Sequence, residues 1–291
     1  MAEETAREPR TSETRRKAGA LPNRLWVGAG MVCALLLIAA FAPLIAPYPF
    51  DGMNIADRFN PPGSTYWFGT DEYGRDILSR TLYGGRLSLF MGLAATAITI
   101  SLGVPLGLIA GYHSGWLDSL LMRTMDVLMS FPPIMLGLLV LAVTEPALWK
   151  TILAVGIVYV PVVVRLTRSV TLELVHEEFI QAARARGEGT TYILMREILP
   201  NAWPPIIVEA SLRVTFAILL GAALSFLGMG AQPPSSDWGL MISEARPFID
   251  RAPWIALAPG LAMGLTVVGI NLLGDGLRES LDPRISRSRG Q

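Results

Sequence analysis

Long uncharged, apolar runs are the feature of this sequence that most constrains its fold. A helix that crosses the hydrocarbon core of a bilayer needs about 20 mostly apolar residues. Only the run 151–164 is clearly short, but Lys150 and Arg165 at its ends can extend to the membrane surface. The six runs are 25–46, 87–112, 127–144, 151–164, 214–236 (its helix starting near Ile206) and 252–274. They predict an all-α membrane protein with about six transmembrane helices.

The composition agrees with a chain whose main solvent is lipid. Of 291 residues, 52% are hydrophobic and only 16% are charged, whereas soluble domains carry roughly 25% charge. The net charge is zero, so no global basic field attracts nucleic acid, and we expect no nucleic-acid partner. The single cysteine, Cys33, lies in an apolar run, where it is expected to behave as a small hydrophobic residue.

The first run could also be a cleaved signal peptide, because basic residues precede it. However, residues 25–46 exceed the usual apolar core of roughly 7–15 residues, and the following 42–47 segment makes a poor cleavage site. We therefore interpret the run as a retained first helix.

The distribution of Lys and Arg predicts the orientation. Basic residues gather in the tail 1–24, in the segment 165–205 and in the C-terminal tail, and six crossings place all three on one side. We expect a multi-pass protein of the bacterial inner membrane with both termini in the cytoplasm. The loop after the first span opposes this rule, although acidic residues lie among its arginines; these are Arg58, Arg75, Arg80 and Arg86.

Several kinds of catalytic chemistry have no motif in the sequence. Neither lysine, Lys17 nor Lys150, lies in a phosphate-binding P-loop, and there is no Gly-x-Ser-x-Gly. His113 and His176 have no partners at metal-ligand spacing. We expect no enzyme activity, metal or cofactor in this chain. The spans alone fit a gradient-driven secondary transporter or channel, and also a membrane enzyme or assembly factor.

The segment 173–205 is the most informative loop. Strong helix formers run to Arg186, Gly187 can end that helix, and a second short helix from Thr190 is expected to stop at Pro200. The small residues Ala182 and Ala183 would let another protein approach closely. An amphipathic helix on the membrane surface is an equally good interpretation from the residues alone.

This segment resembles the EAA loop of binding-protein-dependent ABC importer permeases. Two positions depart from that motif: Gln181 replaces its glutamate, and Glu197 replaces its isoleucine, which follows one place later as Ile198. The resemblance implies a loop that docks on an ATPase subunit. Its residues are Gln181, Ala182, Ala183, Gly187, Ile198, Leu199 and Pro200.

A second motif resembles the Gly-Thr-Asp-x-x-Gly-Arg-Asp signature of the dipeptide, oligopeptide and nickel branch, in its "C"-type subunit. The alternative is a plain polar turn between two spans. The signature residues are Gly69, Thr70, Asp71, Gly74, Arg75 and Asp76. The segments 118–133, 274–278 and 281–283 are similar to the same family.

The resemblance implies a type I ABC importer fold and a division into four parts. These are a cytoplasmic tail 1–24, a first helix with an extracytoplasmic linker 25–84, a permease domain 85–285 that contains the loop 173–205, and a tail 286–291. It also implies partners: a second permease subunit, two ABC ATPases that use ATP and Mg²⁺, and an extracytoplasmic substrate-binding protein. Di- or oligopeptides are the favoured substrates; nickel complexes and glutathione are alternatives.

Two polar features inside the spans have no assigned substrate role. Glu209 and Arg213 are four residues apart, so they share a helix face and can pair. They are either functional or a satisfied interfacial pair. Pro132 and Pro133 are expected to kink the third span.

Overall fold

The structure is a computed structural model that describes residues 21–142 and 145–281. The predicted tails fall largely outside these residues: the basic residues up to Lys17, and the stretch from Asp282 onward. The last two residues of the run 127–144 also lie outside them.

The described residues form helices and no strand, which confirms the all-α prediction for this part of the chain. The longer helices are α1 (Leu21–Ala40), α3 (Ile77–His113), α4 (Trp116–Met129), α5 (Pro133–Leu141), α6 (Leu148–Leu174), α9 (Leu199–Phe226) and α11 (Trp254–Leu281). The shorter ones are α2 (Ala42–Ile45), α7 (Glu178–Ala185), α8 (Thr190–Tyr192) and α10 (Trp238–Ala245). Single turns occur at Ile55–Asp57, Ile193–Ile198 (π-helical) and Arg246–Phe248.

Four helical segments are long and apolar enough to cross a membrane: α3, α6, Thr190–Phe226 and α11. The pair α4 and α5 makes a fifth if it counts as one bent span. Arg24–Ala40 is a shorter apolar helix. The prediction of about six spans is therefore supported for four or five of them, and α1 stays the predicted sixth.

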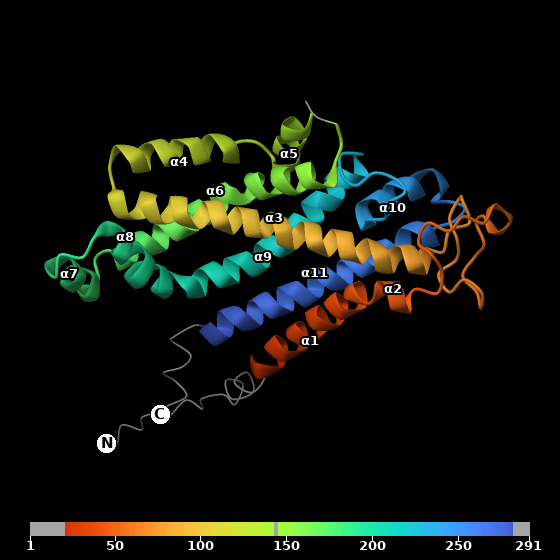
Figure 1. Ribbon diagram of the computed structural model, residues 1–291, viewed down its shortest axis with the longest axis horizontal. Coiled ribbons are helices and arrows are strands. Elements are labelled where there is room, and N and C mark those ends of the chain that lie inside the picture. Colours follow the sequence, from red (N-terminus) through yellow and green to blue (C-terminus); the bar gives the residue numbers. More distant parts are fainter. Residues whose placement is uncertain (1–20, 143–144, 282–291) are drawn as a thin grey trace, which may run out of the picture.

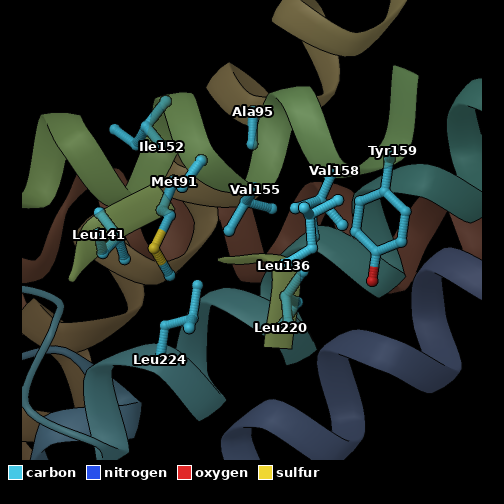
Figure 2. Close-up of a cluster of buried hydrophobic side chains, with 12 residues drawn as sticks. Met91, Ala95, Leu136, Leu141, Ile152, Val155, Val158, Tyr159, Leu220 and Leu224 are labelled. Atoms are coloured by element: carbon cyan, nitrogen blue, oxygen red, sulfur yellow. The ribbon is translucent and has the colours of Figure 1, made fainter. Parts of the chain in front are cut away.

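The third predicted span is interrupted at its two prolines, as the sequence predicts. Its apolar run divides between α4 and α5, which meet at an angle of 93°. Pro132 and Pro133 explain the break, because proline lacks an N–H group and disfavours helical geometry in the preceding residue. α4 lies along the outside of the bundle (Figure 1). α5 turns inward, and its Leu136 and Leu141 join the buried cluster with Val155 and Leu224 (Figure 2).

The short run 151–164 belongs to a longer helix than predicted. α6 continues to Leu174, so Arg165 and Arg168 lie inside a helix and not in a loop. Both arginines face α4. Arg168 donates to both carboxylate oxygens of Asp118 at 2.5 and 2.6 Å, and Arg165 pairs with Asp126. These pairs explain how α6 carries two charges near one end.

Pro200 does not stop the second helix of the loop, contrary to the prediction. The helix runs without interruption from Thr190 to Phe226. The turn 193–198 is π-helical, so its hydrogen-bond pattern is already shifted where the N–H of Pro200 is missing. This wider turn lets the chain accept the proline and continue into the membrane as α9.

A stripe of glycines brings α3 and α6 together. A Cβ atom at Gly107 would lie 2.5 Å from Thr167 Cβ, and one at Gly111 would lie 2.6 Å from Thr171 Cβ. Gly103 makes the same approach to Val163. Small residues every four positions allow close helix packing in membranes, where van der Waals contact drives association.

The two ends of the bundle hold different structures (Figure 1). α7 and α8 lie at one end, toward which the start of α1 and the end of α11 also point. The segment 46–76 and α10 lie at the opposite end. The two motifs found in the sequence are therefore separated by the length of the bundle.

Candidate functional site

The first candidate site is the elbow, which we define as residues 175–200. Its helix α7 has one buried side: Ile180 and Ala183 are fully buried. They pack in a cluster whose other buried members come from α3, α6 and the helix leading into α9; among these are Val104, Leu108, Val163, Ile193, Ile198, Ala202 and Ile206. The elbow is thereby fixed to three of the spanning helices.

The outer side of α7 is exposed. Gln181 and Ala182 face solvent, whereas Ala183 does not. Both alanines were expected to face a partner protein, but only Ala182 lies at the surface. The small size of Ala183 instead serves the packing of α7 on its own chain. Of the remaining motif residues, Ile198 is buried and Pro200 is exposed.

Gly187 ends α7 as the sequence predicts. Its φ of +78° lies in the left-handed region, which favours glycine. Its N–H donates to the carbonyl of Arg184 at 2.9 Å, and the N–H of Glu188 donates to that of Ala183 at 3.2 Å. These two bonds form a Schellman motif, which satisfies carbonyls at the end of a helix. The turn that leads from α7 to α8 is thus set by backbone bonds.

The surface of the elbow combines charge with exposed apolar groups. Arg186 lies 3.5 Å from Glu197 and 3.7 Å from Glu188, and it is 55% exposed. Phe179, Tyr192 and Met195 also present large exposed side chains. Aromatic residues and Met are enriched in protein interfaces.

The second candidate site is the signature segment, and Asp71 is its centre. One carboxylate oxygen accepts hydrogen bonds from the backbone N–H groups of Tyr73 and Arg75, each at 2.9 Å. The other accepts from Arg75 Nε at 2.5 Å and from Arg80 Nη1 at 2.6 Å. Both guanidinium groups also donate to Glu244 of α10, Arg75 at 3.3 Å and Arg80 at 2.8 Å. The result is a buried ion-pair network between the signature, α3 and α10.

The other signature residues shape the turn. Asp76 caps α3 by accepting from the Ser79 N–H at 2.8 Å. The carbonyl of Thr70 accepts from Trp254 Nε1 at 3.1 Å, which ties the segment to α11. Gly69 and Gly74 both have positive φ, +75° and +72°. A Cβ atom on Gly74 would lie 1.8 Å from the Asn54 carbonyl oxygen, so only glycine fits there.

Every signature residue is therefore used inside the chain. The segment is a polar turn, but a buried one, and it joins three helices and the stretch 54–60. This also explains two of the basic residues that break the charge rule: Arg75 and Arg80 are 2% and 1% exposed, and both pair with Asp71 and Glu244. Burial raises the pKa of nearby Glu72, and the negative charges of Asp71 and Glu244 raise it further; a backbone hydrogen bond and the charge of Arg75 act in the opposite direction.

Glu209 and Arg213 do share a helix face, as their spacing predicts. Glu209 Oε1 lies 2.7 Å from Arg213 Nε. The guanidinium also lies over the rings of Tyr159 in α6 and Phe216 in α9, at 5.3 and 4.7 Å from their centroids. The pair is thus a contact that links α6 to α9. Within residues 21–142 and 145–281, no group of three or more His, Cys, Asp or Glu side chains could hold a metal ion.

Comparison with known proteins identifies the class. Residues 103–287 match the family described as binding-protein-dependent transport system inner membrane component. Residues 24–62 match the N-terminal transmembrane domain of oligopeptide transport permease C. The chain belongs to this family of importer permeases. More narrowly, it is an ABC importer permease of the dipeptide and oligopeptide branch, as the two motifs predict.

Individual relatives agree with this assignment. The chain is 45% identical over 259 residues to a dipeptide transport system permease protein of Alkalihalophilus pseudofirmus, covering 89% of this chain and 85% of the relative. It is 46% identical over 255 residues to a glutathione transport system permease protein of Escherichia coli, covering 87% and 84%. These matches favour the importer over the gradient-driven alternative.

A solved structure supports the fold. The methionine ABC transporter MetNI, in an inward-facing conformation, aligns with a TM-score of 0.59 and 19% identity. The alignment covers 71% of this chain and 98% of the MetNI chain. The chain therefore has the fold of an ABC importer transmembrane subunit.

Proposed function

We propose that this permease subunit imports short peptides and is driven through its elbow by a separate ATPase. Two of its relatives are named as dipeptide and di/tripeptide permeases, and another as a glutathione permease. All three substrates are short peptides with free carboxylates. Half of the pathway would come from this chain and half from a second permease subunit. A binding protein on the outer side would deliver the peptide.

The observation that carries the coupling proposal is the two-sided character of α7. Its inner side is packed through Ile180 and Ala183 against helices that cross the membrane. Its outer side, including Gln181 and Ala182, is exposed. A partner that grips the outer side can therefore move the spanning helices as a packed unit. ATP and Mg²⁺ would be held by two such ATPase partners.

The mechanism follows from two discrete states. ATPase subunits that close on ATP would displace the elbow, and the packed helices would rock from inward-open to outward-open. A partner can shift this equilibrium only by binding one state more tightly than the other. The elbow supplies the contact through which that difference in binding acts.

Replacing Ala182 by tryptophan tests the docking surface. The large side chain would point outward, so the permease should still insert, but co-purification of the ATPase and peptide uptake should fall at least about tenfold. Ala56→Trp is the matched control, because Ala56 is also exposed but lies at the opposite end of the bundle. It should leave ATPase association unchanged. Normal association of the Ala182→Trp variant would refute the docking proposal.

The cytoplasmic position of the elbow needs its own test. In a Cys33→Ala background, we expect Gln181→Cys to react with a membrane-impermeant maleimide only in inside-out vesicles. Asp51→Cys, in the segment at the other end, should react only in right-side-out vesicles. Both positions are exposed, so accessibility differs only by side. The reverse pattern would place the elbow outside and remove the basis for coupling.

A further inference from the structure

A pocket of about 540 Å³ lies at the signature end of the bundle. This volume is within the range of roughly 300–1,000 Å³ that is usual for small-molecule sites. The pocket shares no side chain with the buried ion-pair network of Asp71, Arg75, Arg80 and Glu244. Its lining residues are Phe50, Tyr83, Arg86, Leu87, Phe90, Ser235 and Ser236.

The fold builds this pocket by docking the start of α10 on α3. Trp238 donates from its ring to the carbonyl of Thr81 at 3.0 Å, and from its backbone to Ser88 Oγ at 3.1 Å. Gly84 and Gly85 give it room, because a Cβ atom at either would lie 3.1–3.2 Å from the indole. The residues just before Trp238 are thereby held beside the first three turns of α3.

Arg86 is the one charged group that lines this pocket. It is exposed and makes no ion pair or hydrogen bond with any residue in 21–142 or 145–281. Its guanidinium lies 6.0 Å from the ring centroid of Tyr83, which in turn lies 4.8 Å from that of Phe50. This contrasts with Arg75 and Arg80 nearby, which are buried and neutralised by acids.

Ser236 provides a second polar group with no partner. Its side chain is 2% exposed, and its hydroxyl has no hydrogen-bond partner. A buried hydroxyl without a partner carries a free-energy cost. A ligand that fills the pocket could supply the missing acceptor. The neighbouring Ser235 also lines the wall.

We propose that this pocket binds the terminal carboxylate of a short peptide, with Arg86 and Ser236 as donors and Phe50, Tyr83 and Phe90 against an apolar side chain. Guanidinium groups match the planar carboxylate with two parallel hydrogen bonds. The position fits an importer, because this end lies opposite the elbow and would face the side from which the peptide arrives. The inference rests on the proposed function, which supplies the peptide as substrate.

Photolabelling tests the site directly. The complete complex with its ATPases, in nanodiscs, is irradiated with radiolabelled alanyl-p-benzoylphenylalanine. Labelling should map to 83–90 of α3 and be competed by dialanine but not by dialanine amide. Arg86→Gln should reduce labelling about tenfold, because a charge-assisted bond is lost, and Arg86→Lys should reduce it less. The control is Arg58→Gln, since Arg58 is exposed at the same end but does not line the pocket.

The outcomes of this experiment distinguish a peptide carboxylate from other ligands of the pocket. Equal competition by the amide, or unchanged labelling in Arg86→Gln, overturns the carboxylate site. Competition by phosphatidylglycerol but not by dialanine assigns the pocket to a lipid phosphate and also overturns it. Uptake of dialanine distinguishes a failure of the proposed function from a failure of the proposed site. If the wild-type complex imports no dipeptide, the proposed substrate fails; if wild type and Arg86→Gln import dialanine equally, only the site fails.

Discussion

The two ends of this permease use their motif residues in opposite ways. At the signature end, Asp71, Arg75 and Arg80 are at most 2% exposed, and both arginines pair with Asp71. At the elbow, the motif residues Gln181 and Ala182 are exposed, and α7 buries only one side. The first motif holds its own chain together, and the second leaves a surface free. A sequence motif therefore marks a segment whose residue types matter. The burial of those residues shows whether they serve contacts within the chain or form an exposed surface.

Among variants that test this contrast, Asp71→Asn should cause the largest loss of stability. It removes the negative charge that faces two buried guanidinium groups, and breaking a buried ion pair typically costs about 3–5 kcal/mol. The purified permease should unfold at a clearly lower temperature. Asp51→Asn, at an exposed position of the segment 46–76, is the control. Equal unfolding temperatures for the two variants would show that the network is not a structural unit.

Two glycines with similar backbone angles give the next test. Gly74→Ala places a Cβ atom 1.8 Å from the Asn54 carbonyl oxygen, so we expect a loss of roughly 3 kcal/mol. Gly187→Ala meets no atom within 4 Å, so only the left-handed strain of about 1 kcal/mol remains. Thermal unfolding of the two purified variants measures the difference. If Gly187→Ala is the less stable of the two variants, the turn at Gly187 tolerates a side chain less well than the open space around it indicates.

Arg186→Gln should have the smallest effect. Its ion pairs with Glu188 and Glu197 are exposed, and such pairs contribute about 0–1 kcal/mol. Stability should change by less than about 0.5 kcal/mol, and the change should vanish in high salt. Denaturation of the wild type and the variant at low and high ionic strength measures it. A larger loss of stability that persists in high salt would mean that Arg186 holds its own chain together, as the signature residues do.

Much of the fold could be predicted because it depends on local signals. Apolar runs located the helices, Gly187 ended α7, and the prolines at 132 and 133 marked the break between α4 and α5. The errors arose where geometry overrides a residue's preference. Pro200 is a helix breaker by type, but a π-helical turn ahead of it lets the helix continue. The 93° angle between α4 and α5 likewise could not come from the prolines alone.

The glycine stripe of α3 shows a signal that was present but not used. Gly103, Gly107 and Gly111 repeat every four residues, which is typical of a close helix contact in membranes. Their partner could not be named from the sequence. Only the packed bundle assigns them to α6.

The sequence by itself determined the class of this protein: a helical membrane chain, with a constrained turn after its first span and a glycine-ended helix in its main loop. These properties follow from hydrophobicity and local backbone preference. The tertiary structure decided which side chains are free. Ala182 is exposed and Ala183 is buried, and Arg86 lines a pocket while Arg75 and Arg80 are enclosed. Residues of the same type, even neighbours in sequence, differ in this way because burial depends on contacts between segments that are distant in the chain.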